Sequence, residues 1–70
     1  MEKCIAKQLV ETGKLSEKQM LAIGEDVNRL DVWEAIVRTG KLSVEQMIEI
    51  GDRVRNFYVW EAVLEIIRKM

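Results

Sequence analysis

The chain has 70 residues and a mass of 8.2 kDa, which allow a single small domain. Eleven Lys and Arg residues against twelve Asp and Glu residues give a net charge of −1, so the composition indicates neither a basic surface for nucleic acid nor an acidic tail. His is absent, which removes the commonest metal ligand and general base, and the single Cys, Cys4, can form neither an internal disulfide nor a thiolate metal site.

The sequence contains an internal repeat with a period of 27 residues. The segment TGKLS occurs at 12–16 and again at 39–43, and the segment VWEA recurs at the same spacing. Aligning 12–38 with 39–65 gives 14 identical positions of 27, and an incomplete earlier copy ends at the first TGKLS. We therefore divide the domain, 1–70, into a half repeat at 1–11, two repeats at 12–38 and 39–65, and a C-terminal extension at 66–70.

Each TGKLS segment is predicted to end one helix and to begin the next. Gly13 and Gly40 follow apolar-periodic runs, where a left-handed helix cap favours a residue without a side chain. Ser16 and Ser43 are preferred N-cap residues, and the Gln three residues after each of them completes a capping box. The segment is therefore a tight connector between helices that the sequence specifies twice.

A second boundary in each copy carries weaker signals. Asp31, with Glu34 three residues later, is a candidate capping box in the first copy, and Asn56 is the better N-cap candidate in the second. Together these signals predict an all-α fold of five short helices, at about 2–12, 16–28, 31–39, 43–55 and 57–69. The tight connectors favour stacked helical hairpins, although a small closed bundle remains an alternative.

Gly24 and Gly51 occupy one repeat position on or beside the apolar stripes of the second and fourth predicted helices. A Gly inside a helix costs about 1 kcal/mol relative to Ala. Because both copies contain it, we predict that another helix crosses closely at each Gly.

The last predicted helix is apolar around most of its circumference, whereas the terminal unit of a repeat stack needs a polar outer face. Stacked repeats also need at least about three units for stability, and this chain has two and a half. We therefore predict that a second copy or a partner covers this helix. The predicted oligomer interface consists of Trp60, Leu64, Ile67 and Met70.

Residues that differ between the two copies gather at the weaker boundary. In repeat arrays, variable positions on one face often form the binding surface, and aromatic and Arg side chains are typical of interface hot spots. The predicted partner-binding residues are Arg53, Arg55, Phe57 and Tyr58 in the second copy and Arg29 and Asp31 in the first. The alternative for Phe57 is that it replaces Leu30 in the core.

No arrangement of residues in the sequence indicates catalysis or a bound cofactor. Ser16 and Ser43 have no neighbouring base to activate them, and both already have a capping role. Cys4 is interpreted as a small, semi-buried apolar residue, and Glu45 and Glu49 as part of a solvated helix face. We therefore expect no enzyme activity, no cofactor and no metal site.

The leading hypothesis is a non-catalytic helical-repeat module for protein–protein interaction, a small adaptor or inhibitor. Its size and duplicated unit would suit a phage or mobile-element accessory protein. A self-assembling structural subunit, with a homo-oligomer formed through the last helix, is the first alternative. The sequence has no signal-peptide pattern and no apolar run long enough to cross a bilayer, so we expect a cytoplasmic protein that does not act at a membrane.

A nucleic-acid-binding helical repeat is the second alternative. The segment LSVEQMIEI at 42–50 is similar to the opening helix of the DNA-reading repeats of TAL effectors. The chain lacks the Gly-Gly pair that follows the base-reading positions in that family, and its 27-residue period is shorter. We interpret the likeness as a shared capping pattern, and the interleaved acidic and basic residues also argue against nucleic acid.

Overall fold

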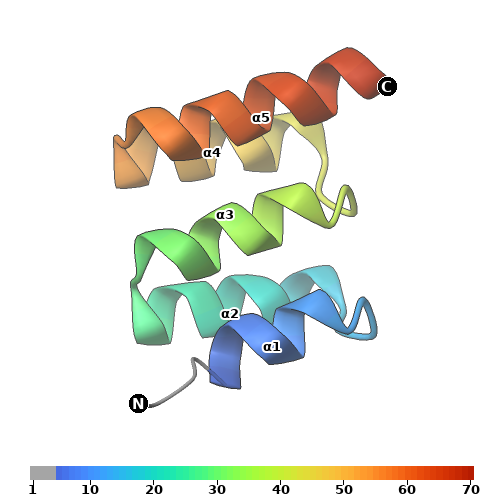
Figure 1. Cartoon of the computed structure of the whole chain (residues 1–70), viewed down its shortest axis with the longest axis vertical. Coiled ribbons are helices and arrows are strands. Elements are labelled where there is room, and N and C mark those ends of the chain that lie inside the picture. Colours follow the sequence, from blue (N-terminus) through green and yellow to red (C-terminus); the bar gives the residue numbers. More distant parts are fainter. Residues whose placement is uncertain (1–4) are drawn as a thin grey trace.

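The computed structural model of the chain describes residues 5–70, which are helical apart from short connectors (Figure 1). The helices are α1 (Ile5–Glu11), α2 (Glu17–Val27), α3 (Leu30–Arg38), α4 (Val44–Val54) and α5 (Phe57–Lys69). This confirms the all-α fold and the five predicted helices, with every described end within one residue of its predicted place. The predicted start of the first helix and the interpretation of Cys4 lie outside the described residues.

The TGKLS connectors have the predicted cap geometry. Gly13 and Gly40 adopt φ angles of 74° and 73°, in the left-handed region that Gly enters without steric cost. The Ser16 hydroxyl accepts a hydrogen bond from the Gln19 backbone amide at 3.2 Å, and the Gln19 side chain accepts one from the Ser16 amide at 2.9 Å. The box at Ser43 has the same pattern one period later. Both predicted capping boxes are therefore confirmed.

The weaker boundaries differ in part from the prediction. Asn56 caps α5 as expected, because its side chain accepts a first-turn amide at 2.9 Å. The Asp31 capping box is wrong: the N-cap of α3 is Arg29, whose side chain makes no capping hydrogen bond. Asn28 and Arg55 end α2 and α4 in the left-handed conformation, with φ angles of 52° and 54°. This tight reversal starts α3 before Asp31, which leaves that residue inside the first turn.

The helices form a small bundle that is organised as an open two-layer stack. α1, α3 and α5 lie side by side in one layer, and α2 and α4 form the second layer behind it (Figure 1). Each TGKLS connector leads from the first layer to the second, and each weaker boundary leads back. Over residues 5–70, α1 does not contact α5 and the α2 backbone does not contact the α4 backbone. The stack is therefore open at both ends, with α3 in its middle.

The hydrophobic core lies between the two layers and is centred on α3. Its buried members are Val10, Met20, Val32, Trp33, Ala35, Ile36, Val37, Leu42, Met47, Ile50, Val59, Ala62 and Val63. α3 contributes five of them, more than any other helix, because it is packed from both sides. Among the described residues no charged or polar side chain is buried.

Gly24 and Gly51 each lie against the ring of a Trp in the following helix. A Cβ atom built on Gly24 would lie 2.6 Å from the Trp33 ring, and one on Gly51 would lie 2.7 Å from the Trp60 ring. Real Cβ atoms essentially never approach another heavy atom within 3.0 Å, so a larger residue at either position would have to displace the ring. The following helix therefore packs on each Gly as expected, but the group that approaches the Gly is a Trp ring. The two rings differ in surroundings, because Trp33 is 2% exposed and Trp60 is 39% exposed.

We predict that Gly24→Ala destabilises the chain more than Gly51→Ala. The enclosed Trp33 cannot move away from a new methyl group, so overpacking should cost about 2 kcal/mol, of which the helix-propensity gain of about 1 kcal/mol offsets only part. Trp60 has an open side, so its ring can move, and the small cost of this displacement should be offset by the helix-propensity gain of about 1 kcal/mol. Urea unfolding followed by circular dichroism measures both variants. Equal destabilisation would contradict the difference in confinement.

Candidate interaction surface

The outer end of the stack exposes side chains whose counterparts one repeat earlier are covered. Trp60 and Leu64 of α5 correspond to Trp33 and Val37 of α3 across the 27-residue period. Leu64 is 48% exposed, whereas Val37 is 0% exposed, and the two Trp rings differ in the same direction. α4 and α5 cover the first repeat, and nothing in the described chain covers the second in the same way.

Two further apolar side chains extend this exposed region. Phe57 precedes Trp60 and Leu64 at helical spacing, so all three lie along one side of α5. Phe57 is exposed, as is Leu30 at the corresponding position, so Phe57 does not fill a core position. Ile48 of α4 is exposed and shares a groove with Trp60. We call the surface formed by Ile48, Phe57, Trp60 and Leu64 the end face.

The groove beside Trp60 has a volume of about 550 Å³. Its lining combines two apolar side chains, one amide and three carboxylates: Ile48, Trp60, Gln46, Glu45, Glu49 and Asp52. The three carboxylate residues are exposed. The corresponding groove beside Trp33 measures only about 60 Å³, because α4 lies against it. The outer groove therefore has an apolar floor and an acidic rim that no other helix fills.

The inner groove shows which side chains fit beside such a Trp. Ile50 of α4 is buried and lines the inner groove together with Trp33. The Arg53 guanidinium donates to the Glu25 carboxylate at 2.7 Å. Near the other ends of these helices, the Lys41 ammonium donates to the carbonyl of Gly13. Side chains, rather than backbone contact, therefore join α4 to α2.

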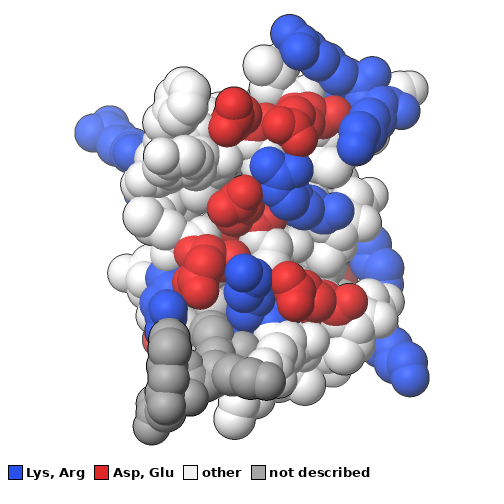
Figure 2. All heavy atoms as spheres, viewed as in Figure 1, with Lys and Arg blue, Asp and Glu red and all other residues white. Residues whose placement is uncertain are grey.

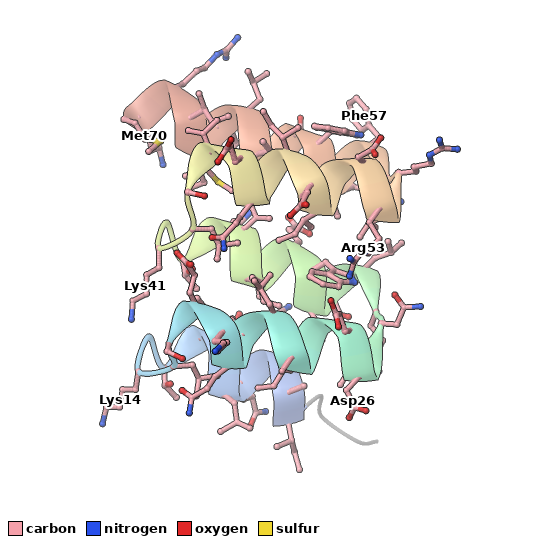
Figure 3. All side chains as sticks on the ribbon, turned by 180° about the vertical axis from the view of Figure 1, so that it is seen from behind. Lys14, Asp26, Lys41, Arg53, Phe57 and Met70 are labelled. Atoms are coloured by element: carbon pink, nitrogen blue, oxygen red, sulfur yellow. The ribbon has the colours of Figure 1, made fainter. Side chains whose placement is uncertain are left out.

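The six predicted partner-binding residues lie at the turns between α2 and α3 and between α4 and α5. Figure 3 shows Arg53 and Phe57 on one edge, opposite Lys14 and Lys41 of the TGKLS connectors. Three of these residues already form ion pairs within the chain. Arg29 pairs with Asp31 at 3.2 Å, and Arg53 pairs with Glu25 at 2.7 Å.

The other three members of this set, Arg55, Phe57 and Tyr58, project from the turn between α4 and α5. Phe57 and Tyr58 are exposed and pack edge to face, with ring centroids 5.9 Å apart. Arg55 is exposed and holds the left-handed position that ends α4. Within the predicted set, Phe57 belongs to the end face and Tyr58 packs against it.

The four residues of the predicted oligomer interface also differ in their exposure to solvent. Trp60, Leu64 and Met70 are exposed, whereas Ile67 is half-buried and packed against the core. The exposed stripe on α5 therefore runs through Phe57, Trp60 and Leu64 and leaves out Ile67.

Sequence reasoning missed two features of this surface. Ile48 lies beside the apolar stripe of α4, and its exposure follows from the position of α4 at the end of the stack. The left-handed positions at Asn28 and Arg55 also lacked a Gly signal. Asn28 has a second role, because its side-chain oxygen accepts the Trp33 indole N–H at 3.4 Å. Arg55 offers no acceptor to Trp60, since a guanidinium only donates.

The layer of α1, α3 and α5 carries interleaved acidic and basic side chains, which Figure 2 shows on its outer face. The Arg38 guanidinium donates to Glu65 at 2.8 Å and to Glu34 at 3.1 Å. The hydrogen bond with Glu65, followed by that with Glu34, raises the pKa of Arg38, and the bond from Arg38 lowers the pKa of Glu65. The outer face of this layer therefore has no continuous basic surface. In the second layer, the hydrogen bond to Glu25 likewise raises the pKa of Arg53.

Comparison of the chain with protein-family models, curated proteins and solved structures finds no match. Within residues 5–70, no helix combines the length and apolar character needed to span a membrane. Over the same residues, no group of three or more His, Cys, Asp or Glu side chains is placed to hold a metal ion.

We predict that the ion pair between Arg38 and Glu65 stabilises the fold at neutral pH and not in acid. Its contribution is present above the pH range in which an unfolded Glu titrates, near 4.3, and is lost as the pH falls through the lowered pKa of Glu65. The melting temperature of the wild type should therefore exceed that of Glu65→Gln at pH 7. The two should coincide at about pH 2, where carboxylates are protonated. A difference that is unchanged between these pH values would assign the effect to packing.

Proposed function

We propose that the chain is a non-catalytic protein-interaction module, a small adaptor or inhibitor, which binds its partner through the end face. The observation that supports this is the exposure of Trp60 and Leu64 at positions where the preceding repeat buries its side chains. Exposed apolar patches with polar rims are typical of interaction sites, and Trp is enriched among hot-spot residues.

Covering the end face would remove a useful amount of apolar surface from water. Full burial of a large apolar side chain stabilises by about 1.5–3 kcal/mol relative to leaving it exposed. Trp60 and Leu64 are both partly exposed, so covering the two would contribute on the order of 2 kcal/mol. Burial of Phe57 and Ile48 would add to this free energy. The four side chains together could therefore form the centre of a small interface.

Self-assembly is the second candidate function, because the same apolar surface would serve a second copy as well as a partner. A structural subunit would use the end face for closed pairing or for open stacking of repeats. The two candidates differ in one measurable property, the dependence of mass on protein concentration.

We predict that Leu64→Glu strongly weakens the capture of a partner, whereas Leu30→Glu does not. Both positions hold a Leu that is about half exposed, but only Leu64 lies on the end face. A tagged chain is incubated with nuclease-treated and untreated lysate of the source cells, and the co-purifying protein is quantified. Leu64→Glu should reduce a stoichiometric partner at least tenfold, the range of a hot-spot residue, with Leu30→Glu near the wild type. Surface changes of this kind should leave the melting temperature nearly unchanged.

The other outcomes separate the alternative functions. A partner that Leu64→Glu retains would exclude the end face as the binding surface. Recovery only from lysate without nuclease would favour nucleic acid. Light scattering that shows mass rising with concentration for the wild type and not for Leu64→Glu would favour self-assembly.

A further inference from the structure

We infer that the groove beside Trp60 binds a basic amphipathic helix of a partner chain, seated as α4 is seated beside Trp33. This inference rests on the proposed function and assigns the chemical class of the partner. It follows from three observations: the repetition of the groove wall, the charge of the rim, and the poor fit of α2 from a second copy.

The wall that receives α4 is repeated at the end of the stack. Leu21, Glu25 and Trp33 line the inner groove, and Ile48, Asp52 and Trp60 hold the corresponding positions one period later. Each wall thus combines an aliphatic side chain, a carboxylate and a Trp ring that lies on a helical Gly. The inner wall is filled by an α-helix that leaves only a small residual volume. A surface with the same composition at the same spacing is therefore suited to a helix.

The charge of the outer groove indicates what this helix carries. α4 places the apolar Ile50 beside Trp33 and, three residues later, Arg53 against the Glu25 carboxylate. At the outer groove Asp52 takes the place of Glu25, and two further carboxylates lie on the rim. Over residues 5–70, neither Glu45 nor Asp52 forms an ion pair. The occupant is therefore a helix with an apolar residue followed three positions later by Lys or Arg, one turn along the same face.

End-to-end stacking of a second copy does not place a suitable helix in the groove. Its α2 is the segment that corresponds to α4, but α1 packs on α2 as α3 packs on α4. Placing α2 of a second copy in the groove would therefore put its α1 in the space that α5 occupies. In addition, α2 carries Asp26 at the position of Arg53, which would place the Asp26 carboxylate against that of Asp52. Like charges in this arrangement repel, so the groove disfavours end-to-end stacking of two copies.

A labelled helical peptide is the probe for this site. It carries residues 43–55 of the chain, stapled on its solvent side, with Glu45→Lys, Glu49→Lys and Gly51→Ala to give a basic and helical occupant. One matched peptide adds Ile50→Asp, which removes the apolar anchor, and a second adds Arg53→Glu, which reverses the paired charge. Fluorescence anisotropy measures binding to the full chain, and amide chemical shifts locate the site.

The basic peptide should bind the wild type and shift amides of α4 and α5 rather than α1 and α2. Ile50→Asp in the peptide, or Trp60→Ala in the protein, should weaken binding at least tenfold, as expected for a central anchor. Asp52→Asn in the protein, an exposed change that leaves the core intact, should weaken binding about threefold, the range of an exposed ion pair. Leu30→Glu should bind like the wild type.

Several results would overturn the inference. Peptide binding that is insensitive to both Trp60→Ala and Asp52→Asn would place the site elsewhere, and equal binding of the Arg53→Glu peptide would remove the requirement for a basic helix. Absence of peptide binding, combined with a cellular partner that still depends on Leu64, would reject the basic helix and leave the proposed function standing. Concentration-dependent dimers that Trp60→Ala dissolves would assign the groove to a second copy.

Discussion

The structure depends on a contact between a Gly inside one helix and the Trp ring of the next. The contact occurs twice, at Gly24 with Trp33 and at Gly51 with Trp60, and neither site has room for a Cβ atom. Each Gly costs about 1 kcal/mol in helix propensity, and burial of a Trp ring offsets this cost. The contact joins α2 to α3 and α4 to α5 as two hairpins, which then stack through α1, α3 and α5.

The same contact connects the fold to the proposed function. In a repeat stack each unit is covered by its neighbour, so the last unit keeps one uncovered side. On this side the second repeat retains Trp60 and has Leu64 and Ile48 in place of Val37 and Leu21, and no helix of the described chain covers them. The end face is thus an inner surface without its neighbour, surrounded by carboxylates. This combination supports binding of a basic helix more directly than it supports a polar terminal cap.

The sequence predicted the features that are encoded locally. The TGKLS connectors specified their own caps through Gly13, Ser16 and the corresponding second copy, and the repetition of a costly Gly indicated the close helix crossings. Other features depend on tertiary structure. The pairing of Arg53 with Glu25 spans 28 residues and follows from the stacking of α4 on α2. The different exposures of Trp33 and Trp60 follow from their places in the stack, since both lie in the same segment, VWEA.

The most direct test of this account is the accessibility of the two Trp rings to acrylamide, measured by fluorescence quenching. The wild type reports both rings, and Trp60→Phe leaves only Trp33. The account predicts that the wild type contains a strongly quenched component that is lost in Trp60→Phe, whose remaining emission is blue-shifted and resists quenching. Light scattering on the same samples should give the mass of one chain. Shielding of both rings in a monomer would contradict the account, because the end face would then already be covered by the chain itself.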